Sequence, residues 1–194
     1  DNYVKSFGGR EAFDKLHTRI MKARLEMPAA NLSMAVTAWA ARPNKMRALV
    51  ESDVVGRIER GFDGVVGWEV STTSGPQILR GAQLEDAARD SRFDGLAAWR
   101  DWVAKAENLG TADVDGKPAW RVRLTPKQGA AQTYFFDQST SLAVKMETTV
   151  RSQMGDIPVE TYLSDYRDVG GVRAPHRTRQ IVGAQEIVTA IESI

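Results

Sequence analysis

The chain has 194 residues, of which 42% are hydrophobic and 26% are charged, a composition ordinary for a folded globular protein of a single domain. Its 26 basic and 25 acidic residues are interspersed and leave a net charge of +1, so nucleic acid is not expected as a partner. The absence of cysteine excludes disulfides and thiolate chemistry, and with only His17 and His176 a histidine-based metal cluster is not expected.

The start of the chain predicts two short helices. Residues 3–7 and 10–16 flank Gly8 and Gly9, and glycine suits the left-handed backbone that ends a helix. Four apolar side chains would hold these helices against a sheet, namely Tyr3, Phe7, Phe13 and Leu16. His17 closes the second helix, where a structural role at its C-terminal end is expected.

Residues 18 to 80 alternate between apolar and polar side chains, which is the pattern of half-buried β-strands. Turns rich in proline, asparagine and glycine separate the runs, and Asp63-Gly64 has the composition of a tight hairpin turn. The expected strands cover residues 18–27, 32–38, 45–51, 57–62, 65–70 and 77–80.

The hydrophobic period then changes from two residues to that of a helix. Helices are expected over residues 84–89 and 96–104, where Leu96, Trp99 and Val103 form one apolar stripe. Trp99 lies on this stripe and is therefore assigned to the core. Trp102 lies off the stripe and is assigned to the rim or gate of a site.

The stretch from Asp113 to Val150 predicts an antiparallel meander. In its first strand, Trp120, Val122 and Leu124 point to one face of the sheet, and the intervening arginines point to the other. A later strand is expected to repeat this pattern with Leu142, Val144 and Met146 opposite Lys145 and Glu147. Further strands are expected over residues 157–166, 173–182 and 186–194, which makes about eleven in total.

With these elements in order, the sequence resembles the bacterial outer-membrane lipoprotein-sorting proteins of the LolA/LolB-like superfamily. The residues that carry the resemblance are Gly8-Gly9, Arg42 to Arg47, Phe62 to Trp68, Asp115-Gly116, Tyr134 to Asp137, Leu142 to Lys145 and Asp165 to Pro175. The resemblance implies a mainly β fold in which a strongly curved antiparallel sheet of about eleven strands forms an incomplete barrel lidded by short helices. It also implies a single lipid-carrier-type domain over residues 1–194.

Members of this superfamily bind acyl chains or other lipidic ligands and carry or sense them in the cell envelope. The resemblance therefore implies a hydrophobic cavity between the sheet and the helices near residues 84–104. Its lining would come from inward strand positions and the two tryptophans of the second helix, and methionine suits variable apolar ligands. The candidate ligand-binding residues are Met21, Leu25, Met34, Val36, Met46, Val50, Trp68, Trp99, Trp102, Val122, Leu124, Tyr134, Phe136 and Met146.

Two other interpretations stay open. The same apolar residues could fill a solid core, in which case the protein is an envelope sensor or protein-interaction module that binds a partner through an edge strand or helical face. A hydrolase would need His176 beside a carboxylate, and Asp165 and Asp168 lie around a turn, where aspartate commonly binds backbone amides. No nucleophile elbow, phosphate loop or metal triad is present, so no catalytic residue, no metal and no cofactor is expected, and the protein is predicted not to be an enzyme.

The resemblance implies export to the periplasm or cell envelope. The chain starts at Asp1 rather than methionine, which is compatible with a processed chain whose export signal has been removed. No apolar run approaches the roughly 20 residues of a membrane-spanning helix. The expected partners are a lipid or lipoprotein acyl chain and, as a second candidate, an envelope protein.

Overall fold

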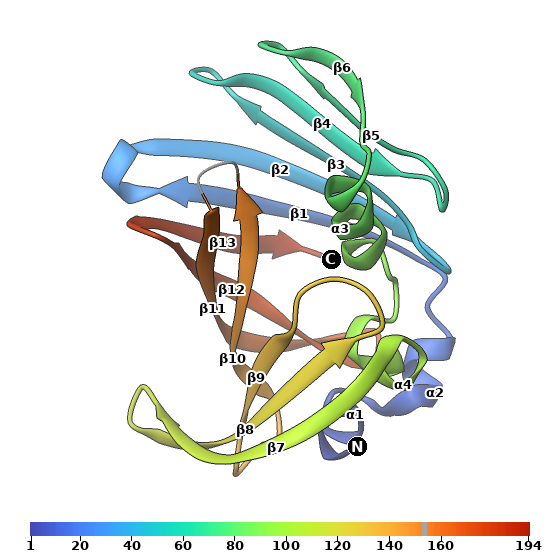
Figure 1. Cartoon of the computed structure of the whole chain (residues 1–194), viewed down its shortest axis with the longest axis vertical. Helices are drawn as coiled ribbons and strands as arrows, with labels where there is room; N and C mark the ends of the chain where they lie inside the picture. Colours follow the sequence, from blue (N-terminus) through green and yellow to red (C-terminus); the bar gives the residue numbers. More distant parts are fainter. Residues whose placement is uncertain (153–154) are drawn as a thin grey trace. The chain divides into compact units, whose positions relative to one another are not determined.

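The computed structural model describes residues 1–152 and 155–194. Its helices are α1 (Asn2–Ser6), α2 (Gly9–Asp14), α3 (Ala82–Asp90) and α4 (Trp99–Trp102), with 3-10 helices η1 (Pro28–Ala30) and η2 (Gly95–Ala98). Its strands are β1 (Thr18–Met27), β2 (Leu32–Ala41), β3 (Lys45–Ser52), β4 (Gly56–Phe62), β5 (Gly67–Ser71), β6 (Gly75–Ile78), β7 (Val103–Val114), β8 (Lys117–Pro126), β9 (Gln132–Asp137), β10 (Ala143–Ser152), β11 (Gly155–Val169), β12 (Val172–Val182) and β13 (Gln185–Ser193) (Figure 1).

The strands form one open antiparallel sheet in the order β6-β5-β4-β3-β2-β1-β13-β12-β11-β10-β9-β8-β7. Most strands pair with their neighbour in the sequence, as expected of successive hairpins. The prediction of a mainly β fold with an open antiparallel sheet and a few short helices is therefore confirmed. The chain divides into two compact units, which are residues 1–13 with 96–188 (the first unit) and residues 14–95 with 189–194 (the second unit).

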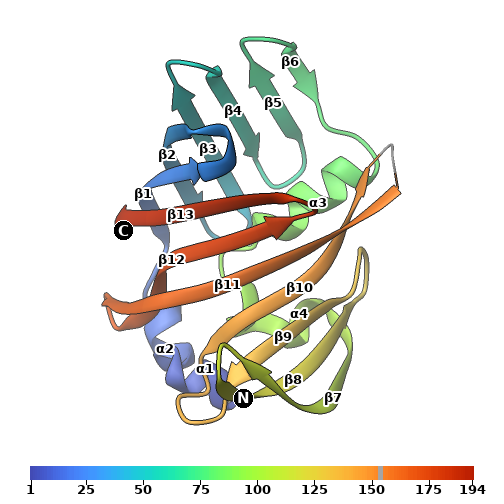
Figure 2. The same ribbon diagram turned by 90° about the vertical axis from the view of Figure 1, so that its left-hand side faces the viewer.

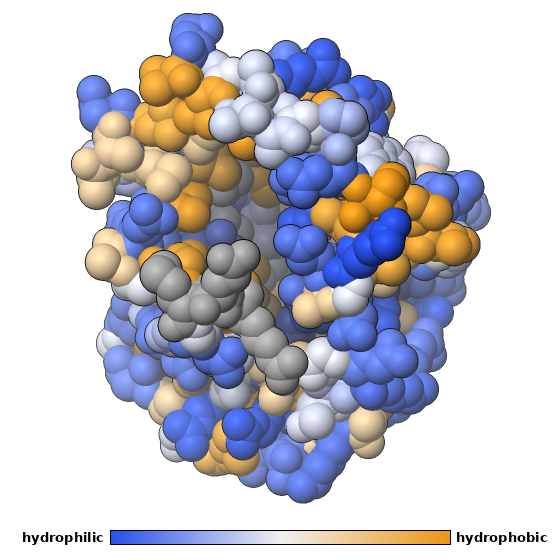
Figure 3. Space-filling model, turned by 45° about the horizontal axis from the view of Figure 1, so that its top comes forward, coloured by the Kyte–Doolittle hydropathy of each residue, from blue (hydrophilic) through white to orange (hydrophobic). Residues whose placement is uncertain are grey.

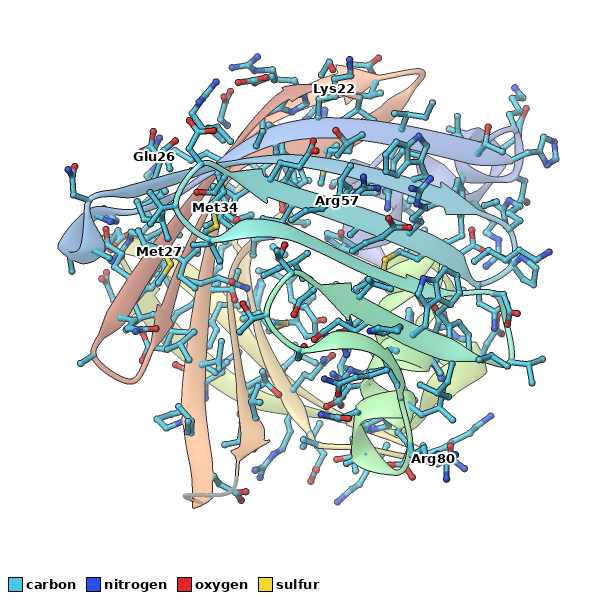
Figure 4. All side chains as sticks on the ribbon, turned by 90° about the horizontal axis from the view of Figure 1, so that it is seen from above. Lys22, Glu26, Met27, Met34, Arg57 and Arg80 are labelled. Carbon is cyan, nitrogen blue, oxygen red and sulfur yellow. The ribbon has the colours of Figure 1, made fainter. Side chains whose placement is uncertain are left out.

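In the second unit, α3 packs on β4 and β5. Phe62, Leu79 and Ala87 form the buried centre of this contact, with Leu84 and Ala88 of α3 packed against it. On β1, Lys22 and Glu26 point away from the face that holds Met27 and Met34 (Figure 4). This alternation follows the period of two that the sequence shows.

In the first unit, neighbouring strands from β7 to β12 lie side by side (Figure 2), and apolar residues pack on both faces of the sheet. On the helix-covered face, Trp102, Val103 and Leu124 form a buried cluster. On the opposite face, Val114, Ala119 and Phe135 form another. Strands β7, β8 and β9 therefore each contribute to two separate apolar layers.

The predicted helix over residues 96–104 is shorter than expected. It consists of η2 followed by the single turn of α4, and the backbone becomes extended at Val103, with φ −85° and ψ 127°. Residues 103–114 then form β7, the edge strand paired with β8, which the sequence did not indicate. Its alanine, lysine and glutamate content favours a helix locally, and pairing with β8 overrides that preference.

Two further details differ from the expected strands. The strand predicted from Val65 begins at Gly67, because the Asp63 carboxylate accepts hydrogen bonds from the backbone amides of Val65 (2.9 Å) and Val66 (2.7 Å) and holds them in a turn. In β10 the register shifts between Ala143 and Lys145. This bulge breaks the period of two, so the expected common face of Leu142, Val144 and Met146 is wrong.

Candidate functional site

An apolar pocket of about 420 Å³ lies in the first unit, between its helical segments and the sheet. Its volume is within the range of natural small-molecule sites. It is lined by Asp1, Asn2, Tyr3, Val4, Leu96, Trp99, Ala106, Asn108, Trp120, Val122, Leu124, Phe136, Gln138 and Ser141. These residues come from α1, the η2–α4 segment, strands β7 to β9 and the turn after β9.

Strand β8 forms the floor of this pocket through alternate residues. Leu124 is buried among Trp102 and Val103, Val122 is half-buried, and Trp120 is 45% exposed. Since residues two apart on a strand point to the same side, the floor runs from a packed core at Leu124 to an open end at Trp120. The pocket therefore has room for an apolar ligand that enters near Trp120 and extends toward Leu124.

The N-terminal helices supply an aromatic wall. The Tyr3 ring centroid lies 5.2 Å from that of Phe7 and 5.3 Å from that of Phe136, and Phe7 stacks on Phe13 at 5.3 Å. Burial raises the pKa of the Tyr3 phenol well above its ordinary value, so this wall is uncharged at neutral pH. The backbone carbonyl of Phe7 also accepts a hydrogen bond from the Arg173 amide (2.8 Å), which ties the end of α1 to the start of β12.

Trp99 lines the pocket, and its ring makes a cation–π contact with the neighbouring Arg100. The Arg100 guanidinium lies 4.3 Å from the Trp99 ring centroid and makes two hydrogen bonds to the Asp1 carboxylate, at 2.6 and 2.8 Å. Trp102, by contrast, is buried at 7% exposure in the cluster with Leu124. The rim position expected for Trp102 is therefore wrong, because the helix ends after one turn and Trp102 packs into this cluster. Trp99 is half-buried and packs against the same cluster, as its place on the apolar stripe predicts, and it also lines the pocket.

The candidate residues of the first unit fall close together. Four line the pocket, namely Trp99, Val122, Leu124 and Phe136. Trp102 and Tyr134 pack in the adjoining cluster, and Met146 is the cross-strand partner of Tyr134. Tyr3, Leu96 and Trp120 line the pocket without having been proposed for it, although the alternation of β8 already placed Trp120 on the same face as Val122.

The other candidates belong to the second unit, where an apolar groove of about 490 Å³ includes two of them. Met46 and Trp68 line it together with Ile20, Trp39 and Phe62. The remaining five, which are Met21, Leu25, Met34, Val36 and Val50, do not line this groove. Large apolar side chains of this unit are also exposed, including Val65 (78%) and Ile78 (59%). Figure 3 shows orange, hydrophobic patches on the surface that are interrupted by hydrophilic side chains.

The polar residues singled out in the sequence have structural contacts. His176 is buried, and its Nδ1 lies 2.9 Å from the Ala174 carbonyl oxygen. Asp168 accepts a hydrogen bond from the Gly171 amide, and Asp165 forms a two-pronged ion pair with Arg167. Within residues 1–152 and 155–194, no group of three or more histidine, aspartate or glutamate side chains is placed to hold a metal ion.

Over the same described residues, none of the helices is both long and apolar enough to cross a membrane. No protein-family model matches the sequence, and no curated protein matches it. Solved structures do match. The class of fold that they define is the LolA-like sheet with short helices, as the sequence resemblance predicts.

Three of these structures cover nearly the whole chain. A LolA superfamily protein from Nitrosomonas europaea matches 98% of this chain and 91% of its own, with a TM-score of 0.63 and 15% identity. A DUF1329 family protein from Desulfovibrio piger matches 100% and 89%, with a TM-score of 0.65 and 13% identity. An outer-membrane lipoprotein-sorting protein domain from Vibrio parahaemolyticus matches 95% and 87%, with a TM-score of 0.57 and 11% identity. At these identities the likeness concerns the fold.

Proposed function

We propose that this chain is a non-enzymatic protein of the cell envelope that binds an acyl chain, or a similar apolar group of a lipid or lipoprotein, in the pocket of the first unit. The observation that carries the proposal is the pocket floor of Trp120, Val122 and Leu124, extended by Phe136 of the neighbouring strand, with Tyr3 of α1 packed on the Phe136 ring. In this proposal residues 1–194 act as one lipid-carrier-type domain. The likeness in fold to lipoprotein-sorting structures supports the same class of ligand.

The mechanism proposed is burial of hydrocarbon without covalent chemistry. Each CH₂ group removed from water contributes about 0.8 kcal/mol, so several methylenes give useful affinity without any specific hydrogen bond. The pocket lining also includes Gln138 and Ser141, whose side chains can hydrogen-bond the polar end of a ligand. The apolar tail would then lie along β8 and the polar end would stay at the open side.

The first test is native mass spectrometry of gently purified protein, followed by solvent extraction and lipid analysis. We expect an acyl lipid to co-purify with the wild type. Val122→Trp should exclude it by filling the pocket floor, whereas Val150→Trp, at a valine that is 45% exposed on β10 and outside the pocket, should retain it. Circular dichroism of both variants checks that they fold.

A wild-type protein that carries no lipid, and that binds neither added fatty acids nor phospholipids, would contradict the proposal. The second candidate function would then take its place. This is an envelope sensor or interaction module, and the observation that favours it is the set of exposed apolar side chains in the second unit, such as Val65 and Ile78. Under that alternative, Val65→Asp and Ile78→Asp would abolish capture of a protein partner, while Val122→Trp would leave it unchanged.

A further inference from the structure

A second cavity of about 670 Å³ lies in the first unit, and we call it the polar cavity because Lys117, Arg177 and Arg179 are among the residues that line it. Its lining comes from the β7–β8 turn, the β9–β10 turn and strands β11 and β12. The residues are Val114, Asp115, Lys117, Pro118, Asp137, Ser139, Thr140, Leu142, Val144, Tyr162, Leu163, Ser164, Asp165, Tyr166, Arg177 and Arg179. None of them lines the apolar pocket.

This cavity belongs to the opposite face of the sheet from the apolar pocket. Phe135 lies between Tyr134 and Phe136 on β9, so its side chain points away from the aromatic wall. Phe135 packs in the cluster that includes Val144 and Tyr162, both of which line the polar cavity. The two cavities are therefore separated by the sheet itself.

Two of the carboxylates of the cavity are already engaged. One oxygen of Asp137 accepts four hydrogen bonds, from the backbone amides and hydroxyls of Ser139 and Thr140, at 2.6 to 3.0 Å. Asp165 pairs with Arg167 through both oxygens, at 3.0 and 2.6 Å. These two aspartates are therefore bonded to other groups, and neither forms an ion pair with a cation of the cavity.

The three cations of the cavity have fewer polar partners than these two aspartates. Arg177 and Lys117 are exposed, and neither has a carboxylate within ion-pair distance among the residues that the structure describes. Arg179 lies 4.2 Å from the Tyr162 ring centroid, which orients its guanidinium, and is 3.6 Å from Glu186. Since Arg177 and Arg179 are two residues apart on β12, both point to the same side of the strand.

From this arrangement we propose that the cavity binds a phosphorylated polyol, with the phosphate between Arg177, Arg179 and Lys117. A guanidinium presents paired N–H donors that match two oxygens of a phosphate. The cavity is larger than a phosphate group, and Asp115 and Ser164 supply acceptors and a hydroxyl for the polyol. The same chemistry occurs in a free metabolite and in a phospholipid head group. The proposal does not depend on the function assigned to the apolar pocket.

The test is isothermal titration of the whole chain with glycerol 3-phosphate, with glycerol as the uncharged comparison. We expect glycerol 3-phosphate to bind and glycerol not to bind. Removing one charged hydrogen-bonding partner by Arg177→Ala should weaken binding about tenfold or more, and Arg177→Glu should abolish it. Arg123→Ala is the matched control, because Arg123 is an exposed arginine on the same face that does not line the cavity.

Added salt should weaken the binding, since the contact is electrostatic and partly exposed. Flotation with phosphatidylglycerol vesicles decides the source of the phosphate, because vesicle binding lost in Arg177→Glu indicates a lipid head group, and binding of the free compound alone indicates a metabolite. The proposal is overturned if the folded wild type binds neither probe. It is also overturned if Arg177→Ala binds as well as Arg123→Ala does. Lipid extraction tests the apolar pocket separately, so the two proposals can fail independently.

Discussion

The two faces of the sheet in the first unit are built from the same strands and have different chemistry. On one face, Val122 and Phe136 contribute to an apolar pocket beneath the helices. On the other face, Lys145 lies between the rings of Phe135 (5.4 Å) and Tyr162 (5.1 Å) and pairs with two glutamates. A strand with a period of two can therefore contribute to an apolar site on one face and to a charged site on the other. The two sites should respond to different mutations.

The largest expected difference is between the two neighbouring tryptophans on the helix-covered face. Trp102→Ala should lower the free energy of unfolding by about 4 kcal/mol, because it empties the cluster around Val103 and Leu124. Trp99→Ala should lower it by only about 1 kcal/mol while weakening acyl binding, because Trp99 is half-buried and lines the pocket. Chemical denaturation followed by circular dichroism measures both. Equal losses of stability would show that the pocket and the core are not distinct.

Gly8 fixes α1 and α2 to the β11–β12 turn, and so fixes one wall of the apolar pocket. Its backbone is left-handed, with φ +125°, and a methyl group there would overlap the carbonyl oxygen of Gly171. Gly8→Ala should cost about 3 kcal/mol of stability and reduce acyl binding. Gly9→Ala is the matched control, because Gly9 is also left-handed (φ +79°) but has open space around it, so about 1 kcal/mol is expected.

Binding of glycerol 3-phosphate by the Gly8→Ala variant tests whether the two faces of the sheet are independent. The polar cavity contains no residue of α1 or α2, so a folded Gly8→Ala protein should bind glycerol 3-phosphate as the wild type does. A parallel loss of both ligands, measured by titration at a temperature where the variant is folded, would mean that the faces are coupled.

Asp137 stabilises one wall of the polar cavity, as Gly8 stabilises one wall of the apolar pocket. Hydrogen bonds from Ser139 and Thr140 lower the pKa of its carboxyl below the ordinary value, so the ionised form stabilises the fold. This contribution is complete above the unfolded-state pKa of about 4 and is lost as the pH falls through the lower folded-state pKa. Asp137→Asn should reduce stability at pH 7 by about 1 to 2 kcal/mol and flatten the pH dependence below pH 4.

Thermal unfolding across pH 2 to 7 measures this effect. Asp156→Asn is the control, because Asp156 is an exposed acid on β11 and its replacement should change stability by less than about 0.5 kcal/mol. If Asp137→Asn kept the wild-type slope between pH 4 and 2, the β9–β10 turn would not depend on that charge.

The sequence was informative where the period of two continued without interruption. It placed Trp120, Val122 and Leu124 on one face of β8, and the structure brings all three into the pocket. It failed at β10, because a bulge between Ala143 and Lys145 adds a residue to one strand and leaves no compositional mark. It also failed at β7, whose residues favour a helix locally and become a strand only by pairing with β8.

The polar cavity could not be found in the sequence for a different reason. Lys117 and Arg177 are exposed residues of their own strands, and Asp137 is a buried residue at the end of β9 whose carboxylate is engaged in the following turn. They line one cavity only because the pairing register of the five strands from β8 to β12 places them close together. Register across many strands depends on contacts between residues far apart in the sequence, which local patterns do not reveal. Met46 and Trp68 likewise share a groove with Trp39, a residue that periodicity alone did not single out.

The smallest expected effect on stability concerns Arg100 at the open side of the apolar pocket. Both Arg100 and Asp1 are more than half exposed, and exposed ion pairs contribute little, so Arg100→Ala should change the free energy of unfolding by less than about 0.5 kcal/mol. The guanidinium nevertheless covers the Trp99 ring at 4.3 Å. Its removal should therefore uncover Trp99, shift the tryptophan fluorescence to longer wavelength and speed the release of a bound fatty acid.

Stopped-flow dissociation of a fluorescent fatty acid measures that release. Lys127→Ala is a suitable control, because Lys127 is an exposed cation that binds the Asp101 carbonyl oxygen (2.8 Å) and does not line the pocket. Salt provides an independent check: it should speed release from the wild type, where it weakens the pair with Asp1, and have little effect on Arg100→Ala. If Arg100→Ala released the ligand at the wild-type rate, Arg100 would be only a surface cation. The open end of the pocket would then be limited by Trp120 alone, and Trp120→Ala would be the variant that speeds release.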